Sequence, residues 1–139
     1  MNHWILKTEA STYSFDDLQR AKRAVWDGVK NPLALKHLRS MQPGDEVLIY
    51  HTGGEKAVVG AARVTKAAYP DPKQRDARLV VVELRAGARL PAPVPLFAIK
   101  ADPVFKDLAL VRMPRLSVVP VTAVQWKRLL QLSRRPSEE

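Results

Sequence analysis

The chain has 139 residues, a formal net charge of +9 and no cysteine, which is enough for one domain with one core. The absence of cysteine excludes disulfides and thiolate metal sites, and no apolar run approaches the roughly 20 residues that span a bilayer. Residues 1–9 place a Lys and a Glu after a very short apolar stretch, which does not make a signal peptide, so we expect a cytoplasmic protein. The positive charge favours a nucleic-acid partner without requiring one.

The first third of the chain predicts a strand followed by two helices. Residues 3–8 alternate as a strand, with Trp4 and Leu6 on one face and Ile5 and Lys7 on the other. A helix should begin after Ser14, because its side chain can accept from the exposed helix amides. A second helix should begin at residues 31–32, where Asn and then Pro suit a helix start, and should end in the turn at residues 42–45.

The remainder of the chain predicts mostly consecutive strands. Residues 46–51 and 57–65 form a hairpin around the turn at residues 52–55, and residues 78–85 form a further strand after a loop at 69–72. Three prolines at 91, 93 and 95 indicate an extended segment, followed by one helical turn at 96–100. A short strand at 117–121 and a terminal helix with a Thr122–Gln125 capping box complete the chain.

This element order predicts an α+β fold, with a mainly antiparallel β-barrel or half-barrel flanked by helices. We expect one domain over residues 1–132 and a frayed tail over residues 133–139.

No motif for nucleotide binding or serine hydrolysis is present. The histidines His3, His37 and His51 fall on different predicted elements without the spacing of metal ligands. We therefore expect neither a metal nor a cofactor.

The segment at residues 25–31 brings a Trp and a Gly to the start of the second helix. The Trp26 ring can border a cavity, Gly28 permits close backbone approach to a ligand, and helix amides can donate to an acceptor. Spacing alone favours the simpler interpretation, in which Trp26 packs in the core.

Six motifs in one order resemble those of EVE domains. They are the opening HWILKTE at 3–9, YSFDDL at 13–18, VWDGVKN at 25–31, YH at 50–51, AYPD at 68–71 and LVRMPRLSV at 110–118. EVE domains are PUA-like, and they are similar to YTH domains, which hold a methylated adenine in an aromatic pocket. The resemblance implies a non-catalytic module that binds a modified nucleobase, in DNA or RNA or as a free nucleoside.

By that resemblance, Trp26 is the ring on which the base stacks. Polar edges would then supply selectivity, and the remaining pocket residues implied are Lys7, Glu9, Ser11, Thr12, Gly28, Val29, Asn31, Tyr50, His51, Arg112, Leu116 and Ser117. The residues alone allow plainer interpretations, such as a Lys7–Glu9 ion pair on the surface or a solvated basic face at Arg112. Two departures from the family pattern, Ala10 and Pro32, mark positions where ligand preference can differ.

Two other functions stay open. Some related ASCH domains resemble nucleobase amidohydrolases that use Lys, Thr and Glu, the residue types of Lys7, Thr8 and Glu9. Strand alternation, however, points Thr8 away from its neighbours. The third possibility is an RNA-binding accessory protein without base specificity. The sequence predicts no membrane association and gives no oligomeric state.

Overall fold

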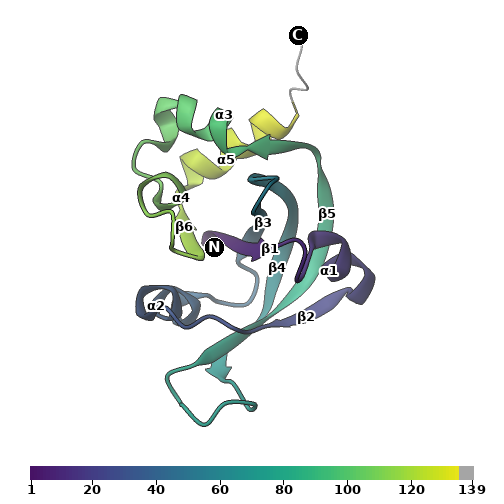
Figure 1. The fold of residues 1–139 in the computed structure, drawn as a ribbon, viewed down its shortest axis with the longest axis vertical. Helices are drawn as coiled ribbons and strands as arrows, with labels where there is room; N and C mark the ends of the chain where they lie inside the picture. Colours follow the sequence, from purple (N-terminus) through teal and green to yellow (C-terminus); the bar gives the residue numbers. More distant parts are fainter. Residues whose placement is uncertain (135–139) are drawn as a thin grey trace.

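The computed structural model describes residues 1–134, which form one mixed sheet with helices on both of its faces (Figure 1). The elements in chain order are β1 (His3–Glu9), α1 (Phe15–Ala21), β2 (Arg23–Trp26), α2 (Pro32–Ser40), β3 (Glu46–Thr52), β4 (Ala57–Pro70), β5 (Val80–Pro95), α3 (Leu96–Ala101), η1 (Pro103–Phe105), α4 (Ala109–Arg112), β6 (Val118–Val121) and α5 (Ala123–Ser133).

The sheet has six strands in the order β2-β5-β4-β3-β1-β6. Only β1 and β3 are parallel, and every other neighbouring pair is antiparallel. The α+β class and the mainly antiparallel sheet are therefore confirmed. Because β2 and β6 are the two edges and do not pair with each other within residues 1–134, strand pairing does not close this sheet into a barrel.

Each face of the sheet carries its own core. On one face, Trp4 and Leu6 of β1 pack with Phe15 and Leu18 of α1 and with the apolar side of α2. On the other face, Ile5 packs beneath α3, η1, α4 and α5. The alternation predicted for β1 is thus confirmed, and both faces are buried because helices cover them (Figure 1).

Local capping fixes where the helices begin. Ser14 accepts from the Asp17 amide and Asp17 accepts from the Ser14 amide, which makes a complete capping box before α1. Asn31 caps α2 by accepting from Ala34 N, with Pro32 at the first helical position, and Thr122 with Gln125 makes a second capping box before α5. These helix starts agree with the sequence.

Two strands differ from the sequence expectations. The four-residue strand β2 was not expected. Strand β5 is one element of 16 residues, where a shorter strand and a separate proline-rich segment were expected. Its prolines fit because four residues of β5, between the partners Arg89 and Val94, oppose only one of β4, between Gly60 and Val58. Pro91 and Pro93 lie in that bulge, where their missing N–H groups break no ladder.

The end of α5 reaches into the segment expected as a tail. Ser133 is the last helical residue, and it is buried. Residues 135–139 of the expected tail lie outside the described residues. No helix in the described part is long and apolar enough to cross a membrane.

Candidate functional site

A cavity of about 580 Å³ opens between the end of β1, the loop before α1, and the edge strand β2. Its lining residues are Thr8, Thr12, Tyr13, Arg23, Ala24, Val25, Trp26, Asp27 and Gly28, and we call it the Trp26 cavity. Its volume lies in the range of about 300–1,000 Å³ that is usual for small-molecule pockets.

Aromatic rings from two elements form its apolar part. The Trp26 ring lies edge-on to the Tyr13 ring, with 6.2 Å between the centroids and an interplanar angle of 77°. Trp26 is only 7% exposed, so the ring is held by the core rather than by the ligand. Gly28, just after β2, has a φ of +78°, which only a glycine adopts without strain and which turns the chain away at the mouth of the cavity.

Several polar groups at this cavity have no protein partner within residues 1–134. These groups are the indole N–H of Trp26 and the hydroxyls of Thr12 and Tyr13. Burial, with a smaller contribution from the Asp17 carboxylate, raises the pKa of Tyr13, so that its hydroxyl is protonated at neutral pH. The cavity therefore offers hydrogen-bond donors beside an aromatic ring, which is the chemistry that binds a planar heterocycle with polar edges.

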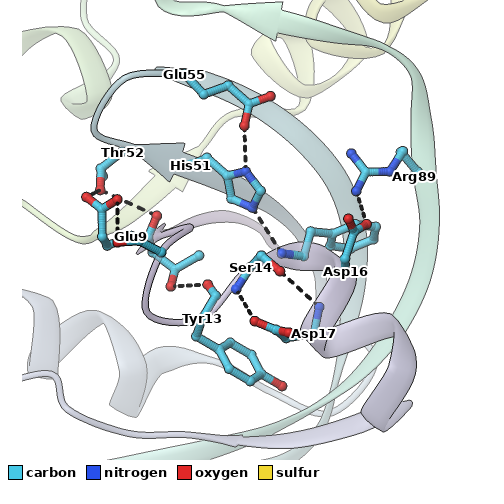
Figure 2. Close-up of polar contacts among 12 residues, drawn as sticks. Glu9, Tyr13, Ser14, Asp16, Asp17, His51, Thr52, Glu55 and Arg89 are labelled. Atoms are coloured by element: carbon cyan, nitrogen blue, oxygen red, sulfur yellow. Dashed lines mark hydrogen bonds and ion pairs between the residues drawn. The ribbon is translucent and has the colours of Figure 1, made fainter.

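The loop that carries Tyr13 is fixed from behind (Figure 2). The Thr8 hydroxyl donates to the Tyr13 carbonyl at 2.7 Å, and the capping box at Ser14 fixes the next residue. The Phe15 amide donates to Nε2 of His51 at 3.0 Å, and Nδ1 of His51 lies 2.7 Å from a Glu55 carboxylate oxygen. In Figure 2 the Tyr13 ring points away from His51. His51 therefore positions this loop from the side opposite the cavity.

Close packing under Phe15 adds to this support. The Phe15 ring lies over Gly60 of β4, where an added Cβ would come within 2.3 Å of the ring. Only glycine at position 60 lets the start of α1 approach the sheet so closely. The position of Tyr13, two residues earlier, depends on this contact.

The structure brings three of the predicted site residues to the Trp26 cavity, namely Thr12, Trp26 and Gly28. Asn31 and Leu116 line a separate hollow of about 380 Å³ together with Leu33 and residues 113–115. The Asn31 side-chain oxygen is used in capping α2, which leaves its amide N–H groups as donors. Val29, which lies between Gly28 and Asn31 in the sequence, is buried in the core and lines neither hollow.

The other predicted residues lie elsewhere. Lys7 and Tyr50 share the opposite face of the sheet, where Lys7 Nζ donates to the Pro114 carbonyl and lies 5.8 Å from the Tyr50 ring centroid. Burial lowers the pKa of Lys7. Glu9 accepts from the hydroxyls of Thr52 and Ser11 and makes no ion pair with Lys7 within the described residues. Arg112 is exposed near Asp107, and the Ser117 carbonyl accepts from the Lys7 amide.

Six residues of the cavity were not predicted as ligands: Thr8, Tyr13, Arg23, Ala24, Val25 and Asp27. The signal for Thr8 was present, because alternation along β1 puts it on the face of Trp4 and Leu6. No local pattern identifies Tyr13, whose place depends on contacts with β3 and β4. Over residues 1–134, no group of three or more His, Asp or Glu side chains is arranged to hold a metal ion.

The family model described as the EVE domain matches residues 2–132. Mouse thymocyte nuclear protein 1 is 27% identical over 165 aligned positions, which cover 94% of this chain and 73% of the mouse protein.

Two solved structures share the fold over nearly their full lengths. Rpa0253 from Rhodopseudomonas palustris has a TM-score of 0.90 and 36% identity, covering 99% of this chain and 97% of that one. The human THYN1 protein, in complex with DNA containing 5-methylcytosine, has a TM-score of 0.90 and 23% identity, covering 99% and 100% of the two chains.

Proposed function

This chain belongs to the EVE domain family, and we propose that it is a non-catalytic module that holds a modified nucleobase of a nucleic acid in the Trp26 cavity. The observation that carries the proposal is the combination at one site of a fixed Trp ring, a Tyr ring and unpaired donors around a cavity of about 580 Å³.

Stacking supplies affinity in this proposal. A base on an aromatic side chain gains about 1–3 kcal/mol, whatever its identity. Because Trp26 is already held by the core, its ring loses little freedom when a base binds. Extruding a base from a duplex costs a few kcal/mol, so single-stranded or mispaired ligands should bind best.

Hydrogen bonds supply selectivity. The indole N–H and the Tyr13 and Thr12 hydroxyls can donate to ring nitrogens or carbonyls, and the Asp27 carboxylate can accept from an exocyclic amine. Asp27 and Trp26 both line the cavity. The human THYN1 protein, which shares this fold, forms a complex with DNA containing 5-methylcytosine, and this supports a modified base as the ligand class.

The absence of catalysis is part of the proposal. A hydrolase built on Lys7, Thr8 and Glu9 needs the three side chains to converge on the substrate. Of these, Thr8 alone lines the Trp26 cavity, and its hydroxyl donates to the Tyr13 carbonyl. Lys7 is held by Pro114 and Glu9 by Thr52. We expect a bound nucleoside to be recovered with unchanged mass.

The test is a binding titration with short single-stranded oligonucleotides, each carrying one modified base and compared with its unmodified twin. The panel includes 5-methylcytosine, 5-hydroxymethylcytosine and N6-methyladenine. We expect at least one modified strand to bind more tightly than its twin. In Trp26→Leu, affinity for that strand should fall by about 5- to 150-fold, because the stacking energy is lost while an apolar side chain still fills the core.

Trp4→Leu is the matched control. Trp4 is as buried as Trp26 and belongs to the same core, but it lies at the opposite end of β1 from Thr8. Its loss should lower stability without changing affinity. Equal affinities for every modified strand and its twin, or an unchanged affinity in Trp26→Leu, would refute the proposal, as would conversion of the nucleoside.

A further inference from the structure

Three arginines stand side by side on neighbouring strands at the β2 side of the sheet. Arg23 of β2 is directly opposite Arg85 of β5, and Arg85 is directly opposite Arg63 of β4. Residues directly opposite each other in antiparallel strands point to the same side of the sheet, so the three side chains form one row. All three are exposed.

Few carboxylates in the described part of the chain neutralise the three arginines. Among the described residues, Arg63 has one carboxylate contact, at 3.8 Å from Glu46, which also engages His3 at 3.2 Å. Arg23 and Arg85 have no ion pair there. Glu83, two residues before Arg85 on β5, accepts from the Tyr69 hydroxyl instead. Like charges directly opposite each other destabilise a sheet, so the fold itself gives no reason for this row.

The row begins at the Trp26 cavity and continues into a second hollow. Arg23, on the edge strand β2, lines the Trp26 cavity. Arg85 and Arg63 lie on the sheet face that α5 covers, and they line a hollow of about 300 Å³ together with Glu46, Trp126 of α5 and the small residues Ala61, Ala62, Ala86 and Gly87. With about 4.8 Å between neighbouring strands, the row is about 10 Å long. One strand of a nucleic acid carries about three phosphates over that distance.

We propose that Arg23, Arg85 and Arg63 form a phosphate-binding row that holds the backbone of the strand whose base enters the Trp26 cavity. The inference rests on the proposed function, which concerns the base, and it adds where the backbone phosphates bind. Guanidinium groups suit this role because they bind phosphate oxygens in a bidentate manner and keep their charge at any physiological pH. The bound phosphates would also relieve the repulsion between the three arginines.

The test measures the salt dependence of binding. The full chain, Arg85→Gln and the triple Gln variant at positions 23, 63 and 85 are titrated with a modified single strand from the panel above and with the free modified nucleoside. The slope of log affinity against log salt should become shallower by about 0.7 for each arginine lost, hence by about 2 in the triple variant. Affinity of Arg85→Gln for the nucleoside should stay the same, because Arg85 does not line the Trp26 cavity, and its Tm should be unchanged or higher.

Lys106→Gln is the control, because Lys106 is exposed and lines neither the Trp26 cavity nor the hollow beside Arg63 and Arg85. It removes the same charge and should leave the slope unchanged. An unchanged slope in the triple variant would refute phosphate binding by the three arginines, even if Trp26→Leu still weakens binding of the strand. A shallower slope in the triple variant together with an unchanged affinity in Trp26→Leu would support phosphate binding by the three arginines and refute base binding in the Trp26 cavity. Displacement of the strand by an equally charged glutamate peptide would overturn the assignment to phosphate.

Discussion

Trp4 and Trp26 are buried in the same core to nearly the same extent, with 5% and 7% of their surfaces exposed, yet their polar surroundings are opposite. The Trp4 indole N–H donates to Asp45 at 3.0 Å, and the same carboxylate accepts from the amides of Gln42 and Asn2. The Trp26 indole N–H has no such partner within residues 1–134, and the residue lines a cavity.

Under the proposed function, the difference separates a structural aromatic residue from one that binds a ligand. Buried polar groups are almost always hydrogen-bonded, because an unpaired one costs about 1–3 kcal/mol. The Asp45 carboxylate accepts a hydrogen bond from each of the three N–H donors beside it. Trp26, Tyr13 and Thr12 line a cavity, and their side-chain donors have no protein acceptor within residues 1–134. Burial alone does not distinguish the two tryptophans, whereas hydrogen bonding does.

The largest effect is expected at the structural end of this comparison, in Asp45→Ala. The change removes the acceptor of three N–H donors at once. We expect the free energy of unfolding to fall by about 3–5 kcal/mol, as measured by chemical denaturation, with base affinity unchanged in the folded fraction. A loss below about 1 kcal/mol would show that water replaces the carboxylate.

Acid should act on the same network. Burial alone would raise the pKa of Asp45, but the hydrogen bonds from Gln42, Trp4 and Asn2 together lower it below the ordinary value of 3.8. A lowered pKa means that the folded state prefers the charged carboxylate. Its stabilising contribution is therefore complete above the ordinary pKa and is lost as the pH falls through the lowered one. Denaturation at pH 6 and pH 3 should show a smaller acid loss in Asp45→Asn than in the parent chain.

A direct comparison of the two tryptophans gives the next largest effect. Both Trp4→Phe and Trp26→Phe remove an indole N–H and part of a ring from one core. Only the first breaks a hydrogen bond to a carboxylate. Trp4→Phe should therefore lose about 1.5–3 kcal/mol more of its unfolding free energy than Trp26→Phe. Equal losses in the two variants would remove the distinction on which the site assignment depends.

Much of the fold could be predicted from the sequence, because helix caps and strand alternation depend on residues close together in the chain. Ser14, Asn31 and Thr122 each begin a helix as their side chains allow, and alternation placed Trp4 and Ile5 on opposite faces. The edge strand β2 escaped prediction because four residues carry too short a pattern. The prolines of β5 could be placed in a strand only once the bulge opposite β4 was known.

The site was less predictable because its parts meet through tertiary contacts. Trp26 was identified through family resemblance, since its spacing indicated an ordinary core residue. Tyr13 reaches the cavity because His51 holds the Phe15 amide and Gly60 admits the Phe15 ring. These contacts join residues 36 or more positions apart in the chain, and no pattern of a short segment contains them. Lys7, Glu9 and Tyr50 illustrate the converse, since their motifs match while their side chains lie away from the cavity.

The smallest effect extends the comparison to two tyrosines. The Tyr69 hydroxyl donates to Glu83 at 2.6 Å. Tyr13 lines the Trp26 cavity, and its hydroxyl has no protein partner in the described chain. Tyr69→Phe should lower the unfolding free energy by about 1 kcal/mol and leave base affinity unchanged. Tyr13→Phe should change stability by less than about 0.5 kcal/mol, because no protein hydrogen bond is lost.

The same Tyr13→Phe variant should bind the modified strand about 2- to 12-fold more weakly, which corresponds to one lost hydrogen bond of about 0.5–1.5 kcal/mol. The raised pKa of Tyr13 keeps the hydroxyl protonated, so the loss should not change between pH 6 and pH 8. Unchanged affinity would leave the Tyr13 ring as a wall of the cavity and transfer base selectivity to Thr12, Asp27 and the Trp26 indole N–H. A pH-dependent loss would instead implicate a titrating group on the ligand, because the hydroxyl itself stays protonated over that interval.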